Sequence, residues 1–77
     1  MSKFYFHVRD GTTFEEDTIG IELPDLISAK REANTAAREM LAERLTSGLH
    51  VNGQVFEICD DDGLLVETVS FRDVLNA

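Results

Sequence analysis

Apolar residues recur every three or four positions between Leu26 and Ser47, and this spacing predicts one long helix. The residues that share its apolar face are mostly small: Leu26, Ala29, Ala33, Ala36, Ala37, Met40 and Leu41. No Gly or Pro interrupts the stretch. Asp25 is the expected N-cap, although Pro24 and Asp25 also suit the first turn. Gly48 is the expected left-handed residue after the last turn.

A period of two predicts a strand near the N-terminus. Phe4, Phe6 and Val8 alternate with more polar residues between Lys3 and Arg9, which is typical of a strand with one apolar face. Residues 12–23 also have an extended pattern, but three acidic residues at 15–17 interrupt it. We expect this stretch to form a ragged return strand or β-arm.

Two further strands are predicted after the helix, over residues 54–60 and 64–69. The sequence Asp61-Asp62-Gly63 between them suits a hairpin turn, in which Gly63 adopts a left-handed conformation. Ser70 is positioned to cap a last short helix over residues 71–75. We expect Phe71 and Leu75 to fold back from this helix onto the core.

This order of elements predicts a single α+β domain over residues 1–77. The expected architecture is a small, mainly antiparallel sheet of three or four strands in ββαββα order, with the long helix across one face and a short C-terminal helix. The Ala-rich helix face permits close approach to the sheet, and four Phe residues supply the bulk: Phe4, Phe6, Phe56 and Phe71. Helix pairing across a dimer is the alternative. Whether the strand after the helix runs parallel or antiparallel to the first strand stays open.

The charge balance bears on the partners. The chain has 15 acidic and 7 basic residues and a net charge of −8. This argues against nucleic acid and against an anionic membrane, because both attract positive surfaces. The basic residues of the helix alternate with acidic ones, so the excess acid lies in the connections, notably at 15–17 and 60–62. Solubility is the simplest explanation for this excess.

The single cysteine and the absence of a targeting signal bear on localisation. Cys59 is the only cysteine of the chain, so no internal disulfide forms, which fits a reducing compartment. The N-terminus does not resemble a secretory signal, and no apolar run approaches the length of about 20 residues that spans a membrane. We therefore expect a cytoplasmic protein.

His7 is the strongest candidate for chemistry. If its strand neighbours 54–60, Glu57 and Cys59 share its face of the sheet. A Cys–His pair makes an activated nucleophile and a Glu–His pair makes a general base. The simpler interpretation is a cross-strand surface cluster, so we assign no catalytic residue and lean against an enzyme.

The acidic turn at Asp60-Asp61-Asp62-Gly63 suggests a cation site, but its spacing is not that of a calcium-binding loop. Asp and Gly are also the ordinary residues of a turn. No phosphate loop, paired-cysteine motif or catalytic triad is present. We therefore predict no metal and no cofactor.

One long helix covers only one face of a sheet, so the second face is a candidate interface. The residues expected there, by their alternation, are Tyr5, His7, Arg9, Val55, Glu57 and Cys59, with part of the apolar group Leu64, Leu65, Val66 and Val69. The alternative is that segment 12–23 or the C-terminal helix covers this face.

Three segments together resemble a known family. They are Phe-His-Val-Arg-Asp-Gly at 6–11, Gly-Ile-Glu-Leu-Pro-Asp-Leu at 20–26, and Phe-Glu-Ile-Cys-Asp-Asp-Asp-Gly at 56–63 followed by Val-Ser-Phe-Arg-Asp at 69–73. The chain resembles domain of unknown function 6894, which implies a small cytoplasmic protein of soil and plant-associated bacteria. This family has no established activity, so it implies no catalytic residues. A looser similarity to antitoxin domains rests on the segment before the helix.

The expected function is therefore a small, non-enzymatic protein–protein interaction module that self-associates, as a homodimer, through the second sheet face or a sheet edge. Its partner is a second copy or another protein. One alternative is a regulatory antitoxin-like or adaptor protein that binds a basic partner through its acidic surface. A small enzyme centred on His7 and Cys59 is the less favoured alternative.

Overall fold

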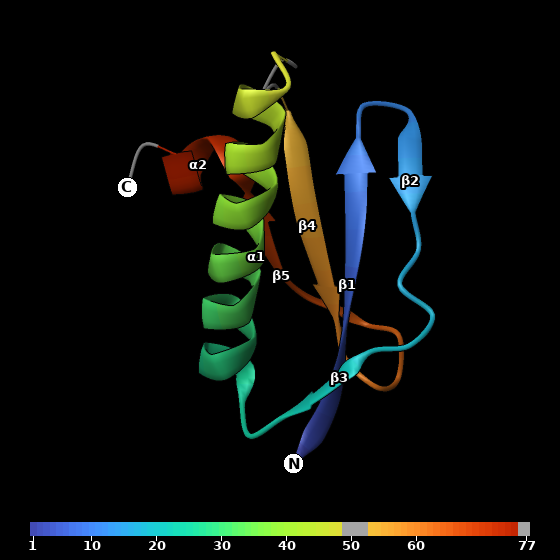
Figure 1. Ribbon diagram of the computed structural model, residues 1–77. Coiled ribbons are helices and arrows are strands. Elements are labelled where there is room, and N and C mark those ends of the chain that lie inside the picture. The colour runs from blue at the N-terminus through green and yellow to red at the C-terminus, as the bar shows by residue number, and fades with distance from the viewer. Residues whose placement is uncertain (49–52, 76–77) are drawn as a thin grey trace.

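The sheet is built on β1 (Ser2–Asp10), the longest of its strands. The computed structural model describes residues 1–48 and 53–75. β1 pairs with β4 (Gln54–Cys59) in antiparallel register, from Tyr5 opposite Cys59 to Asp10 opposite Gln54. The strand order is β2-β1-β4-β5, and β3 is a further partner of β1 (Figure 1). The strand after the long helix, β4, therefore runs antiparallel to β1, a direction that the sequence did not determine.

Segment 12–23 forms two short strands, which brings the sheet to five strands. β2 (Thr13–Glu15) pairs with the end of β1, and β3 (Ile21–Leu23) pairs with its beginning, both antiparallel and on the same edge. Residues 16–20 connect them without forming a strand. The acidic interruption seen in the sequence therefore marks a real break in the strand pairing.

The long helix is α1 (Leu26–Thr46), and both of its predicted ends are confirmed. The Asp25 side chain caps the first turn by accepting a hydrogen bond of 2.8 Å from the Ser28 backbone N–H. Ser47 is the C-cap, and Gly48 follows it with φ of 74°, which glycine adopts without strain. None of the described helices combines the length and apolar character that a bilayer crossing requires.

The core lies between α1 and one face of the sheet, as predicted. Three alanines and a leucine of the helix are buried: Ala29, Ala33, Ala37 and Leu41. The sheet and α2 supply the larger side chains, which are Phe4, Phe56, Ile58, Val69 and Phe71. The ring centroids of Phe56 and Phe71 are 5.0 Å apart. Small residues on the helix thus let bulky residues of the sheet fill the interior.

The last two elements are β5 (Leu65–Ser70) and α2 (Phe71–Leu75). Phe71 is fully buried, as predicted, but the prediction for Leu75 is wrong, because its side chain is 51% exposed. Val74 is buried instead. Positions three and four residues after Phe71 both lie on its side of a helix, so the period alone does not choose between them. The sequence alone did not assign the apolar residues at 64–66 and 69 to one face of the sheet. In the structure, Val66 and Val69 pack with the core.

Candidate functional site

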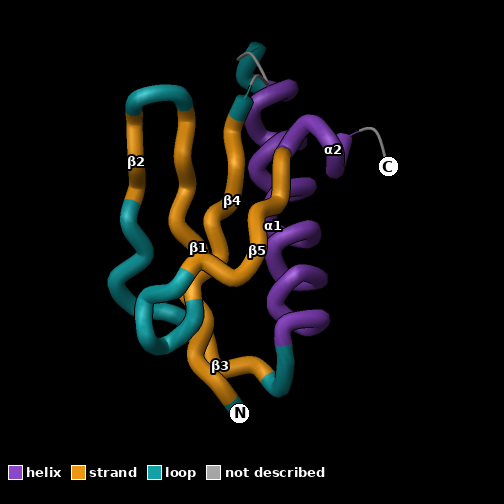
Figure 2. Tube along the Cα trace, turned by 180° about the vertical axis from the view of Figure 1, so that it is seen from behind, coloured by secondary structure: helices purple, strands orange, loops and turns teal. Residues whose placement is uncertain are grey.

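The second face of the sheet carries no helix. In Figure 1, α1 lies in front of the sheet, and in Figure 2, seen from behind, the strands lie in front of α1. The six predicted interface residues are three cross-strand pairs on this face: Tyr5 opposite Cys59, His7 opposite Glu57, and Arg9 opposite Val55. α2 does not cover them, and β2 and β3 extend the sheet at its edge. The loop of residues 16–20 between these two strands lies against Tyr5 and His7.

The neighbouring strands add four residues to this face. Phe14 of β2 lies opposite Arg9, and Leu65, Thr68 and Ser70 of β5 lie opposite Cys59, Glu57 and Val55. We call the whole set the open face: Tyr5, His7, Arg9, Phe14, Val55, Glu57, Cys59, Leu65, Thr68 and Ser70. The sequence did not single out Phe14, since its face depends on the register between two strands. Its place in the extended pattern starting at Thr12 was the available signal.

The centre of the open face is a network of aromatic and paired charged groups. Arg9 Nε donates to Glu57 Oε2 at 2.7 Å, and this hydrogen bond, followed by the charge of Glu57, raises the pKa of Arg9. The Arg9 guanidinium also lies 4.6 Å from the centroid of the Phe14 ring. The His7 ring lies 5.4 Å from the same ring. The two charges cancel, and Phe14 keeps 43% of its surface exposed.

Asp17 joins the edge of β1 to the loop between β2 and β3. Its Oδ2 accepts the Phe6 backbone N–H at 3.1 Å, and its Oδ1 accepts the N–H groups of Ile19 and Gly20 at 3.0 and 3.1 Å. Its own N–H donates to His7 Nδ1 at 3.0 Å. The Asp17 carboxylate thus replaces a strand at the point where β2 and β3 leave β1 unpaired.

The charge state of Asp17 follows from these contacts. Burial alone would raise the pKa of its carboxyl, but hydrogen bonds from Phe6, Gly20 and Ile19 and the influence of His7 outweigh it. The net result is a pKa below the ordinary value, as expected for a carboxylate that accepts several backbone N–H groups. Gly20 has φ of 76°, and a Cβ there would lie 3.0 Å from the Tyr5 ring, so glycine is required for this close approach.

His7 and Cys59 do not form an activated pair. They are diagonal neighbours, since Tyr5 and not His7 lies opposite Cys59. His7 Nδ1 is an acceptor for the Asp17 N–H, which places any ring proton on Nε2. Burial raises the pKa of the Cys59 thiol, and the charges of Glu57 and Asp60 raise it further. Both effects oppose the thiolate that a nucleophile requires.

An acidic hollow of about 400 Å³ lies at one end of the open face. It is lined by Tyr5, His7, Cys59, residues 16–18 and residues 60–63. Asp60 Oδ1 accepts the N–H groups of Asp62 and Leu64 at 2.9 and 3.0 Å, so this carboxylate stabilises the hairpin turn. Within residues 1–48 and 53–75, no three His, Cys, Asp or Glu side chains are arranged to hold a metal ion.

At the sheet edge formed by β5, the side chain of Glu67 bonds to the backbone of the same strand. The Thr68 backbone N–H donates to Glu67 Oε1 at 3.0 Å, and Glu67 Oε2 lies 3.4 Å from Lys30 Nζ of α1. The hydrogen bond from Thr68, followed by the contacts with Lys30, lowers the pKa of Glu67. A carboxylate therefore occupies one backbone donor that an added strand would need.

Comparison with known proteins gives a family but no activity. Neither the curated proteins nor the solved structures contain a match to the chain. A family model matches residues 3–72, which include all of the open face and every helix and strand except the ends of β1 and α2. On this match, the chain belongs to the family described as Domain of unknown function (DUF6894).

Proposed function

We propose that this protein is a non-enzymatic interaction module that self-associates, with two copies meeting through their open faces. The observation that carries the proposal is a sheet face without a helix, on which Tyr5, Phe14 and Val55 surround one compensated charge pair. Aromatic side chains beside a paired arginine are typical of the centre of protein interfaces. A two-fold axis through this face would let the same patch serve both partners.

Charge favours a second copy on this face. Each copy carries a net charge of −8, so two copies repel wherever unpaired carboxylates face one another. On the open face, Arg9 compensates Glu57, whereas the unpaired acids gather at one end, in the hollow lined by residues 60–63. Contact centred on Arg9, Phe14 and Val55 would therefore bury neutral surface and leave the acidic end in water.

The sheet edge is the less favoured surface for self-association. Strand addition at β5 needs free backbone donors, and the Thr68 N–H already donates to Glu67. The opposite edge consists of β2 and β3, which have only three residues each and are separated by residues 16–20, so it offers no long strand for pairing. The proposal therefore assigns the contact to the open face.

Light scattering on a gel-filtration column, at low and high salt, tests the proposal. We expect a dimer for the wild type and a shift toward monomer for Val55→Asp and Tyr5→Ala, since one adds a charge and the other removes a ring at the contact. Ile27→Asp is the matched control: it introduces the same charge at an exposed apolar residue of α1. Its mass should equal that of the wild type.

Circular dichroism on the same samples separates misfolding from dissociation, because all variants should keep the helical signal of α1. A monomeric wild type at high protein concentration would overturn the proposal. So would a Val55→Asp variant that associates as tightly as the wild type while Ile27→Asp does not.

The second candidate is a regulatory antitoxin-like or adaptor role in which the acidic hollow binds a basic partner. The supporting observation is that the described lining of this hollow contains no Lys or Arg. Such binding should weaken steeply with salt, because exposed charges are screened, whereas contact through the open face should change little. The lone Cys59 supports assignment of either role to a reducing compartment, here the bacterial cytoplasm.

A further inference from the structure

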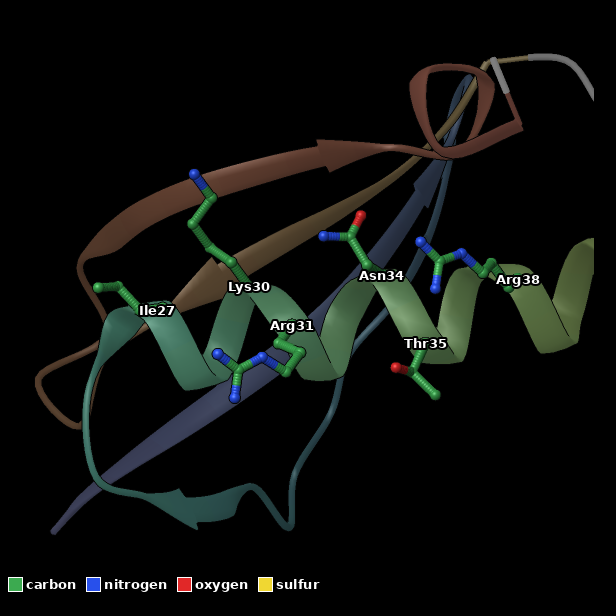
Figure 3. A pocket seen from close by; sticks show the side chains of 6 residues that line it. All are labelled: Ile27, Lys30, Arg31, Asn34, Thr35 and Arg38. Carbon is green, nitrogen blue, oxygen red and sulfur yellow. The ribbon is translucent and has the colours of Figure 1, made fainter. Parts of the chain in front are cut away.

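The outward face of α1 carries basic side chains that the fold pairs only in part. Six residues line a shallow hollow of about 330 Å³ there: Ile27, Lys30, Arg31, Asn34, Thr35 and Arg38 (Figure 3). Three of them are basic, in a chain with 7 basic residues in total, and none is acidic. We call Lys30, Arg31 and Arg38 the basic strip.

The charges of the basic strip are only partly compensated. Lys30 lies 3.4 Å from Glu67. Hydrogen bonds from Ser28 lower the pKa of Asp25, and the charge of Arg31 lowers it further. Within residues 1–48 and 53–75, Arg38 forms no ion pair. Arg31 and Arg38 are two helical turns apart, which corresponds to about 10.5 Å along the axis.

An apolar groove adjoins the basic strip at Arg38. This groove has a volume of about 270 Å³ and lies between α1 and α2, where it is lined by Arg38, Leu41, Ala42, Leu45, Val74 and Leu75. Leu45 and Leu75 are 58% and 51% exposed. Exposed apolar side chains grouped around a groove are typical of a binding surface.

We infer that the outward face of α1 binds an acidic segment of another protein. Carboxylates of this segment would pair with Arg31 and Arg38, since guanidinium groups bind carboxylates in a two-pronged geometry. A large apolar side chain of the same segment would fill the groove between Leu45 and Leu75.

Charge complementarity identifies the occupant despite the acidic net charge. At about 0.15 M salt, exposed charges are screened within about 8 Å, and the molecule measures 37 × 25 × 18 Å. Binding there therefore depends on the charges near the basic strip, which include Asp25, Glu32, Glu39 and Glu67, more than on the net charge of the chain. Nucleic acid fits less well, because three cations neutralise few phosphates and the apolar groove has no counterpart in a phosphate backbone.

This surface is independent of the open face. Figures 1 and 2 show α1 on one side of the sheet and the open face on the other. Two copies joined through their open faces would each present a basic strip on the outside, so the pair would bind two acidic segments.

Selection from a random peptide library displayed on phage tests this inference on the full chain. We expect the wild-type protein to enrich peptides that combine Asp or Glu with a large apolar residue. The best peptide, labelled with fluorescein, should bind Arg31→Gln/Arg38→Gln at least about tenfold more weakly. The matched control is Lys3→Gln/Arg44→Gln, which removes the same charge elsewhere and should bind like the wild type.

Four outcomes would overturn the inference: no enrichment, enrichment of peptides without carboxylates, equal weakening in the control, or tighter binding of a single-stranded oligonucleotide than of the acidic peptide. Leu45→Ser supplies a separate readout of the groove. It should weaken the labelled peptide without changing the salt dependence, because it removes apolar contact and no charge. The solution mass of each variant shows whether self-association is retained, so failure of this inference is distinguishable from failure of the proposed function.

Discussion

The two faces of the sheet are made by alternating residues of the same strands, yet they differ in burial and in polarity. On the core face, Phe56 and Ile58 of β4 pack beneath α1 and are buried. On the open face, Val55, Glu57 and Cys59 of the same strand are only partly buried. One strand therefore serves two environments, because successive side chains point to opposite sides.

The difference separates stability from the recognition that we propose. The core face contributes free energy of folding, since it removes apolar surface from water. The open face contributes less burial in a single copy, so substitutions there should cost less stability. Substitutions at adjacent positions of β4 should consequently have very different effects.

The largest effect is expected for Ile58→Ala. Ile58 is fully buried, and truncation of such a residue costs about 2–5 kcal/mol, a large part of the roughly 5–15 kcal/mol that stabilises a small domain. Val55→Ala, on the other face of β4, should cost about 1 kcal/mol or less. Urea unfolding followed by circular dichroism measures both free energies of unfolding. Equal losses of unfolding free energy in Ile58→Ala and Val55→Ala would contradict the difference between the two faces.

The next effect concerns Asp17, which contacts residues of both faces through Phe6 and His7. Asp17→Asn removes the charge and replaces one acceptor with a donor, so at about pH 7 we expect a loss of about 1–3 kcal/mol. Glu16→Gln is the matched control, because it removes the same charge from an adjacent exposed residue. Its cost should stay within about 0.5 kcal/mol.

The pH dependence of this difference has a defined sign. The pKa of Asp17 is lower in the folded protein than its ordinary value, so the folded state binds this proton more weakly than the unfolded state. Its contribution is complete above about pH 4 and is lost as pH falls through the folded-state pKa. Urea unfolding at a series of acidic pH values should show wild type and Asp17→Asn converging. A constant difference would argue against the carboxylate as the cause.

The smallest effect concerns the reactivity of Cys59 on the open face. Burial, followed by the charges of Glu57 and Asp60, raises the pKa of its thiol. Near pH 8, we expect alkylation by iodoacetamide to be at least about threefold slower than that of glutathione, because less thiolate is present. Mass spectrometry follows the reaction, and the rate should rise with pH. If Cys59 reacted faster than glutathione, the result would support a nucleophilic cysteine on this face instead.

The sequence was sufficient to predict the features that depend on local pattern. Period and capping residues located α1 and its ends at Asp25 and Gly48, and alternation located His7, Glu57 and Cys59 on one face. These signals work because a helix end and a strand face are set by residues close in sequence.

The features that were missed depend on register and tertiary contact. The side chain of Asp17 bonds the backbone of Phe6, which is 11 residues away, and nothing in an acidic loop predicts that partner. Phe14 joined the open face only through its pairing with Arg9. Leu75 and Val74 are both apolar, and the angle at which α2 leaves β5 decides that Val74 is the buried one.

The carboxylate of Glu67 on the Thr68 N–H has a consequence at high protein concentration. A sheet whose last strand accepts another strand grows without limit, and such growth ends in fibres. With this donor occupied at one edge and only three-residue strands at the other, neither edge is a good template for an added strand. The contact between identical faces that we propose would close on itself, so assembly through it would end at a finite size.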